Sequence, residues 1–161
     1  MRPLLKLSAI TSLALILNAA AYADSDRRGR SFAIEGIATI TNDGTGMRIN
    51  GVNMDIHRNA DFDDISINRA NGKWLEVEGY MTQNRLVVTD VDYNRWRPTS
   101  PKKDDGRLEM NLKGLVQANP IAMWGYRVSD HSLNGYEGHW LEIECDYNLH
   151  TNTISRCDID D

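Results

Sequence analysis

Apolar and polar residues alternate along two stretches of the chain, at residues 32–40 and 108–116. In the first stretch the apolar positions are Phe32, Ile34, Gly36, Ala38 and Ile40. In the second they are Leu108, Met110, Leu112, Gly114 and Val116. A period of two predicts a β-strand with one buried face, and a glycine on that face indicates a bend or a close backbone approach.

The same pattern along the rest of the chain predicts a protein made almost entirely of strands. The expected strands are 32–41, 46–57, 62–67, 73–81, 85–92, 107–117, 121–129, 139–147 and 153–160. One helical turn is expected at 66–71. In the second strand of each half the apolar residues change from odd to even positions at a glycine, Gly51 or Gly125. Such a change is the expected sequence pattern of a β-bulge.

The two halves also share residues. Gly72–Gly79 returns as Gly138–Cys145, and Thr89–Asp92 returns as Cys157–Asp160, which indicates an internal repeat. A β unit of this size removes its edges best by closing into a barrel. We therefore predict an all-β fold of two tandem small OB-like antiparallel β-barrel units, the second a reduced copy. Their bounds are 30–92 and 107–161, with 93–106 as a proline-containing linker.

The first half resembles a family of bacterial exported proteins, the domain-of-unknown-function family numbered 5666. The matching positions are Gly36-x-Ala38, Ile49-Asn50-Gly51-Val52, Gly72, Val77-Glu78-Gly79 and Val91. The second half matches closely only over 138–160. The resemblance implies small β-barrel domains in envelope or secreted proteins, and it carries over no catalytic residue.

The first 23 residues are typical of a secretory signal peptide. Arg2 and Lys6 precede an apolar stretch from Leu7 to Leu17, and Ala21-Tyr22-Ala23 fits the cleavage rule. Cleavage after Ala23 predicts a periplasmic or secreted protein without a membrane span. The full chain has a net charge of −5, and cleavage makes it more negative because the signal peptide contains Arg2 and Lys6. This negative charge argues against nucleic acid or an anionic membrane as the main target.

Cys145 and Cys157 are the only cysteines of the chain. The alternation of each strand places both cysteines on the buried face, and the two strands are expected to form a hairpin. Export would place the cysteines in an oxidising compartment. We predict a disulfide between them. A redox pair and a metal site are the alternatives, although the C-x-x-C spacing of a redox pair is absent.

Carboxylates stand opposite each other across the last hairpin of each half. The expected pairs join Glu76 and Glu78 to Asp90 and Asp92, and Glu142 and Glu144 to Asp160 and Asp158. Because acid opposite acid is unfavourable in a sheet, compensation is required. It would come from basic residues of a third strand or the linker (Arg48, Arg69, Arg95, Arg97, Lys102, Lys103), from Ca²⁺, or from a basic protein partner. Asp61, Asp63 and Asp64 are assigned to a solvated loop.

No enzyme motif is present. Ser129-Asp130-His131 contains the residue types of a hydrolase triad, but adjacent side chains diverge, and the four histidines lack the spacing of a zinc site. Carboxylates also serve glycosidases, but here they are expected on a convex face rather than in a cleft. Tyr93 and Trp96 are a candidate contact for a sugar or a protein, with linker packing as the alternative.

The sequence therefore predicts an exported, non-enzymatic binding module. The alternative is an envelope factor that binds a basic protein, a cell-wall component or Ca²⁺ through its acidic hairpin faces, and a carboxylate-based hydrolase comes third. A protein or glycan partner is favoured over nucleic acid. No cofactor is expected, apart from Ca²⁺ as the alternative ligand of these carboxylates.

Overall fold

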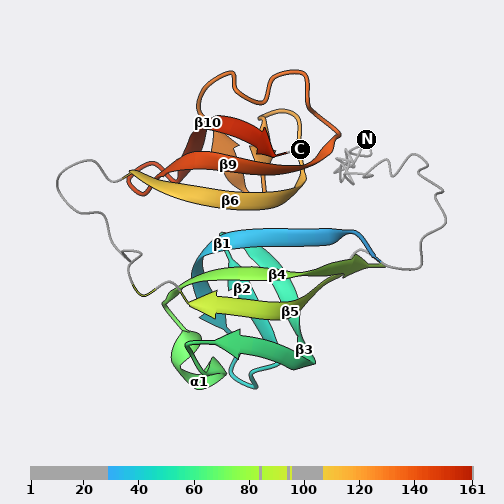
Figure 1. Ribbon diagram of the computed structural model, residues 1–161, viewed down its shortest axis with the longest axis vertical. Helices are drawn as coiled ribbons and strands as arrows, with labels where there is room; N and C mark the ends of the chain where they lie inside the picture. Colours follow the sequence, from blue (N-terminus) through green and yellow to red (C-terminus); the bar gives the residue numbers. More distant parts are fainter. Residues whose placement is uncertain (1–28, 84, 94, 96–106, 161) are drawn as a thin grey trace, which may run out of the picture.

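The computed structural model describes residues 29–83, 85–93, 95 and 107–160. The predicted signal peptide, most of the predicted linker and Trp96 therefore lie outside the described residues. The first half contains β1 (Ser31–Ile40), β2 (Gly46–Ile49), β3 (Val52–Asp63), α1 (Ile67–Ala70), β4 (Trp74–Thr82) and β5 (Arg85–Tyr93). The second contains β6 (Arg107–Leu115), β7 (Ala122–Met123), β8 (Tyr126–Val128), β9 (Trp140–Asn148) and β10 (Thr153–Asp160). The prediction of an all-β protein is confirmed (Figure 1).

The strands of the first half close into a five-stranded barrel. Its order is β1-β2-β3-β5-β4, and β1 closes the ring because it pairs with both β2 and β4. The pairing of β3 with β5 is parallel, and the other pairings are antiparallel. The short helix α1 lies between β3 and β4, at the predicted helical turn. The predicted small barrel of the first half is therefore confirmed.

The second half follows the same order but does not close. Its strands run β6-β9-β10-β8-β7, again with one parallel pairing, between β8 and β10. The closing contact between the end of β6 and β7 is reduced to one isolated bridge, Gln117 with Ala122. The two halves are joined directly, because β6 pairs with β1 at Lys113 and Ala33. The result is one continuous ten-stranded sheet rather than two separate barrels.

The glycines at the two parity changes belong to hairpin turns, so the predicted bulges at Gly51 and Gly125 are wrong. Asn50 and Gly51 have φ values of 46° and 83°, and Trp124 and Gly125 have 50° and 80°. Positive φ at both central residues defines the two-residue turn that matches the twist of a hairpin. Each expected strand, 46–57 and 121–129, is thereby split in two, β2 with β3 and β7 with β8.

The register shifts that do occur lie elsewhere in the sheet. One separates Ile56 from Asp61 in β3, and another separates Glu78 from Gly79 in β4. The third lies between Ser155 and Asp158 in β10. The expected separate strand 62–67 is instead the end of β3 followed by the start of α1.

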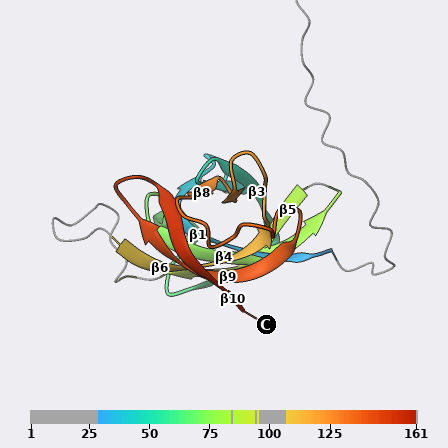
Figure 2. The same cartoon turned by 90° about the horizontal axis from the view of Figure 1, so that it is seen from above.

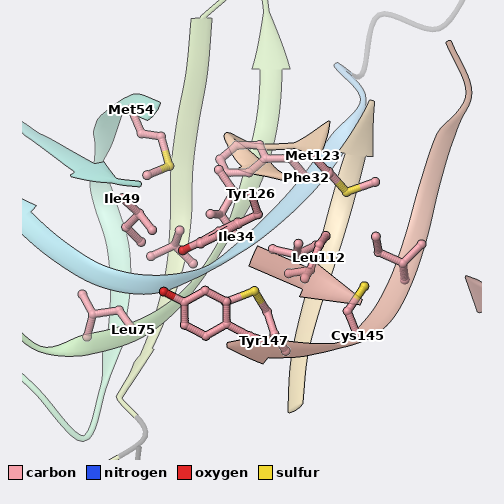
Figure 3. Close-up of a cluster of buried hydrophobic side chains, with 14 of the residues drawn as sticks. Phe32, Ile34, Ile49, Met54, Leu75, Leu112, Met123, Tyr126, Cys145 and Tyr147 are labelled. Atoms are coloured by element: carbon pink, nitrogen blue, oxygen red, sulfur yellow. The ribbon is translucent and has the colours of Figure 1, made fainter. Parts of the chain in front are cut away.

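One hydrophobic core serves both halves. The curved sheet places β3 and β8 across the interior from β1 and β4 (Figure 2). Figure 3 shows Ile49 and Leu75 of the first half in the same cluster as Leu112 and Met123 of the second, and all four are fully buried. Neither half encloses this apolar surface by itself. No helix of the described residues has the length and apolar character needed to cross a bilayer.

Two glycines of the alternating strands admit aromatic rings of the second half. A Cβ on Gly36 would lie 2.3 Å from the Tyr126 hydroxyl, and a Cβ on Gly114 would lie 2.4 Å from the Trp124 ring. Both distances are far below any real contact, so only glycine fits at either position. The expectation that these glycines mark close approaches is confirmed.

Glu35 lies at the junction of the two halves and is 3% exposed. Its carboxylate accepts hydrogen bonds from Trp74 Nε1 at 3.1 Å and from the backbone N of Asn111 at 3.2 Å. Its backbone oxygen accepts a hydrogen bond from the Tyr126 hydroxyl at 2.7 Å. These contacts connect β4, β6 and β8 to β1 where the β1–β6 pairing has only one register pair, so side chains replace the missing sheet hydrogen bonds.

The predicted disulfide between Cys145 and Cys157 is confirmed. It joins β9 to β10 across their hairpin, and both cysteines are buried, at 2% and 7% exposure. It lies within the register shift of β10, so it holds the two strands together where the ladder is interrupted. No cysteine remains free.

Replacing both cysteines by alanine is expected to lower the free energy of unfolding by about 2–3 kcal/mol, because the unfolded chain gains the entropy of an open loop. Urea unfolding of the variant and of the parent protein, each with and without a reductant, measures this change. A reductant that lowers the stability of the variant as much as that of the parent would contradict the assignment.

Changing Tyr126 to phenylalanine is expected to lower the free energy of unfolding by about 1–3 kcal/mol, because the buried oxygen of Glu35 loses its donor. Burial raises the pKa of the Tyr126 phenol, so this hydroxyl remains a donor at neutral pH. Tyr136→Phe is the matched control, because Tyr136 is 39% exposed and its loss should leave stability nearly unchanged. Equal unfolding midpoints for the two variants would remove Tyr126 from this role.

Candidate functional site

The outer face of the sheet carries a row of cross-strand partners that extends over seven strands. Figure 1 shows these strands side by side, from β3 through β5, β4, β1, β6 and β9 to β10. The residues of the row are direct register partners in this order: Asp61, Asp90, Glu78, Ala33, Lys113, Glu142 and Asp160. Five of these seven side chains are carboxylates and one is basic.

A second row lies two residues away on each strand. Its first part is Asp63, Asp92, Glu76 and Glu35, and its second part is Asn111, Glu144 and Asp158. The hydrogen bond from the backbone of Asn111 to the Glu35 carboxylate connects the two parts. We call the two rows together the carboxylate array. The acidic faces of the two hairpins thus belong to one surface.

The predicted pairings of the carboxylates are confirmed by the register. Glu76 faces Asp92 and Glu78 faces Asp90 in the first half. In the second half Glu142 faces Asp160 and Glu144 faces Asp158. Like charges therefore stand opposite each other at equivalent places of both hairpins, an arrangement that destabilises a sheet.

The assignment of Asp61 and Asp63 to a solvated loop is wrong. Both belong to β3, where Asp61 pairs with Asp90 and Asp63 pairs with Asp92. Strand β3 therefore adds acids beside the β4–β5 hairpin. A third strand was one expected source of basic residues to compensate the charge of that hairpin. The alternation of Asp61, Phe62 and Asp63 was the available signal, because it has the period of a half-buried strand.

In the first half the array surrounds a shallow hollow of about 230 Å³. Its lining consists of Asp61, Asp63, Glu76, Glu78, Asp90, Val91 and Asp92. The expectation of a simple convex face is wrong here, because acids of β3, β4 and β5 line a hollow. Six carboxylates thus point toward one small volume of solvent.

The basic residues expected to compensate this charge lie in several different places. Lys113 lies within the array, and its Nζ donates to the Glu142 carboxylate at 2.7 Å. Arg95 contacts Asp64, at 3.6 Å, rather than a member of either row. Arg48 lines a different cleft, and Arg69 lies in α1. Arg97, Lys102 and Lys103 lie outside the described residues.

The crowding of carboxylates in the second half changes the acidity of Glu144. The neighbouring Glu109 carboxylate raises the pKa of Glu144 above its ordinary value of 4.5, and Asp160 and Asp158 add to the effect. Glu109 lies on β6 and precedes Asn111, the register partner of Glu144. The array therefore repels its own members, and the protein retains this repulsion in the folded state.

The residues Ser129 and Asp130, which their adjacency excludes from a triad, and the candidate contact residue Tyr93 lie at separate places in the fold. Ser129 donates to the backbone of Ile154, and Asp130 accepts from Ser132 and from the backbone of Arg156, so both have structural roles. Tyr93 ends β5 opposite Leu75, and its proposed partner Trp96 lies outside the described residues. Across the described part of the chain, no group of three or more His, Cys, Asp or Glu side chains is arranged to hold a metal ion.

A larger open cleft of about 570 Å³ lies at the other end of the first barrel and was not predicted. Arg85 and Asp55 form an ion pair in its wall, beside Arg48 and Asn53. Threonines of β1 and of the following turn line the opposite side. Its charged side chains Arg85 and Asp55 pair with each other, whereas the carboxylate array gathers many acids of one sign, so the array is the stronger candidate site for a charged ligand.

Changing Glu144 to glutamine is expected to stabilise the protein at neutral pH and to leave it unchanged in acid. A raised pKa in the folded state means that the folded protein binds this proton more tightly, so stability falls as pH rises through that pKa. Melting temperatures from about pH 3 to 8 measure the effect, with Glu137→Gln as the control outside the array. A Glu144 variant that melts below the parent at pH 7 would contradict the repulsion.

No protein-family model, curated protein or solved structure matches this chain. The resemblance of the first half to the domain-of-unknown-function family 5666 therefore stays a prediction. The candidate site depends on the geometry of the carboxylate array alone.

Proposed function

We propose that this protein is an exported, non-enzymatic binding module of the bacterial cell envelope, and that its carboxylate array binds a basic partner. One observation carries the proposal: acidic side chains align in two rows across seven strands, and Lys113 is the single base within them. A fold under selection for stability alone gains nothing from such an arrangement, because like charges opposite each other oppose folding.

A basic protein segment suits this surface better than the other ligands. Complementary charge accelerates association and excludes partners of the same charge, so the array favours cationic over anionic ligands. Nucleic acid is disfavoured for this reason. A cell-wall component with amino groups is the alternative, and Ca²⁺ is a further one, since it accepts several carboxylate oxygens.

The compartment supports the same proposal. A buried disulfide is typical of proteins that fold in an oxidising environment. The predicted signal peptide with cleavage after Ala23 leads to the periplasm or the exterior, and the protein encounters basic envelope proteins and cell-wall amino groups there. Within this proposal the two halves derive from one repeated unit, the second reduced.

A carboxylate-based hydrolase is the second candidate, and the acidic hollow favours it. Glycosidases place two carboxyl groups on either side of a scissile bond, and six surround this hollow. The hollow is small and open, whereas such enzymes hold a sugar chain in a longer cleft. Assays on peptidoglycan and glycan substrates with the protein and its Glu76→Gln, Glu78→Gln variant test this candidate, and turnover lost in the variant would establish it.

The binding proposal is tested with residues 24–161 as a crosslinked bait in the envelope fraction of the source organism. The test bait carries Glu76, Glu78, Glu142 and Glu144 changed to glutamine. The native bait is expected to capture a basic partner that the test bait loses, and the capture should weaken with added salt because exposed charges are screened.

A matched control bait keeps the array and loses the same charge elsewhere. It carries Asp43, Asp55 and Asp64 changed to asparagine and Glu137 changed to glutamine, four acids outside the two rows. This control should capture the partner as the native bait does. Equal loss with both variants would show that net charge, rather than the array, is responsible. The melting temperatures of the native and test baits are also measured with added Ca²⁺. A rise in the native bait that is absent from the test bait would make Ca²⁺, rather than a basic partner, the ligand.

A further inference from the structure

The outer edge of β10 is paired over only part of its length. In the first half β3 stays beside β5 to the pair Asp63 and Asp92. In the second half β8 ends at Val128, and β10 pairs with it only at Thr153 and Ile154. Along the described chain, no strand pairs with the stretch from Cys157 to Asp160 on the side away from β9.

The start of this free edge is structurally marked. Arg156 has a positive φ of 50° within the register shift, and its backbone N donates to the Asp130 carboxylate at 2.7 Å. The Asp130 carboxylate therefore accepts the hydrogen bond of this backbone N at the position where β8 has ended. Beyond it the strand continues with regular pairing to β9, from Asp158 to Asp160.

The first half shows what occupies the equivalent edge there. Val77 pairs with Val91 as Ile143 pairs with Ile159, so Ile159 takes the place of Val91. Phe62 of β3 lies beside Val91 in the parallel pairing and packs against the core. With this neighbour present Val91 is 2% exposed, whereas Ile159 is only half-buried. The second half has the receiving strand, and no strand among the described residues covers it.

We propose that the β10 edge from Cys157 to Asp160 receives an extended segment of the basic partner as an added strand, parallel to β10. This inference rests on the proposed function, because it takes the basic partner from it and adds the mode of binding. Main-chain hydrogen bonds to the free edge supply affinity, and alternate side chains supply specificity. The added strand extends the sheet by one position, as the end of β3 does in the first half.

The register specifies the chemistry of the segment. Its central residue is apolar and lies beside Ile159, where Phe62 lies beside Val91 in the first half. The residues on either side are lysine or arginine, at the positions that Asp61 and Asp63 take beside Asp90 and Asp92. The basic side chains then face Asp158 and Asp160 and continue both rows of the carboxylate array with opposite charge.

A second copy of this chain does not fit the edge. Two β10 edges pairing with each other would place Asp158 and Asp160 beside the same acids of the neighbour, which is unfavourable. Charged side chains on an edge strand keep unrelated strands away. The same aspartates attract a strand with basic residues at alternate positions, so the edge selects its partner by charge.

The test uses a nine-residue peptide with the sequence of residues 57–65 in which Asp61, Asp63 and Asp64 are replaced by lysine. A control peptide has the same composition but exchanges the phenylalanine with a neighbouring lysine, which shifts the alternation by one residue. Binding of labelled peptide to residues 24–161 is measured by fluorescence anisotropy, and hydrogen exchange of the Cys157–Asp160 amides reports strand addition. The first peptide should bind about tenfold tighter than the control and slow this exchange.

Two charge-reversal variants locate the site. Asp158→Lys with Asp160→Lys should weaken binding of the lysine peptide at least about tenfold and create binding of the unchanged 57–65 sequence. Asp90→Lys with Asp92→Lys reverses the same charge elsewhere in the array, where β3 already covers the edge, so it should weaken binding of the lysine peptide clearly less and create no binding of the unchanged sequence. The melting temperature and the intact disulfide verify that each variant is folded.

The outcomes separate this inference from the proposed function. Equal binding of both peptides, reduced alike by both charge reversals and without slower exchange, would overturn strand addition while leaving a basic partner on the array. Absence of binding by either peptide, together with an unsuccessful capture from the envelope, would overturn both. Self-association of the parent protein that protects the same amides would replace the basic partner by a second copy.

Discussion

The contact of Tyr126 with β1 at Gly36 holds the two halves of this protein together. The phenol of the second half enters the core at the one position of β1 without a Cβ, and it donates to the backbone oxygen of Glu35. The Glu35 carboxylate meanwhile accepts from Trp74 and from the backbone of Asn111. Because β1 and β6 share only one register pair, these side-chain hydrogen bonds satisfy polar groups that a regular sheet would pair.

This junction also creates the outer surface. Once β6 stands beside β1, the last hairpins of the two halves become parts of one sheet, and their carboxylates lie along the same two rows. The second half closes less completely than the first, and its buried disulfide joins β9 to β10 where their ladder is interrupted. Among the described residues, the end of β10 has no neighbour like the one that β5 has in β3, because β8 ends at Val128. The acidic surface thus follows from the junction of the halves, and the free edge follows from the short β8.

The arrangement has an energetic consequence for the folded state. Acids that face each other on neighbouring strands, such as Glu144 and Asp158, repel each other at neutral pH, and the raised pKa of Glu144 reports part of this repulsion. Hydrophobic burial in the core that both halves share stabilises the folded state and offsets this repulsion. Under the proposed function a cationic ligand relieves this repulsion, and binding would then raise the stability of the folded state.

The sequence by itself determined the all-β class, the position of most strands, the disulfide and the pairing of acids within each hairpin. Each of these depends on side-chain periodicity or on a short loop, and neighbouring residues specify both. Local signals did exist for two features that the prediction missed: Asn50-Gly51 is typical of a hairpin turn, and Asp61-Phe62-Asp63 has the alternation of a strand. Only the tertiary structure decided that Asp61 and Asp63 lie beside Asp90 and Asp92 and that β1 joins the halves, because these pairings depend on contacts between residues distant in sequence. The parallel pairing of β3 with β5 and the entry of Tyr126 beside Gly36 are set by the packing of the shared core.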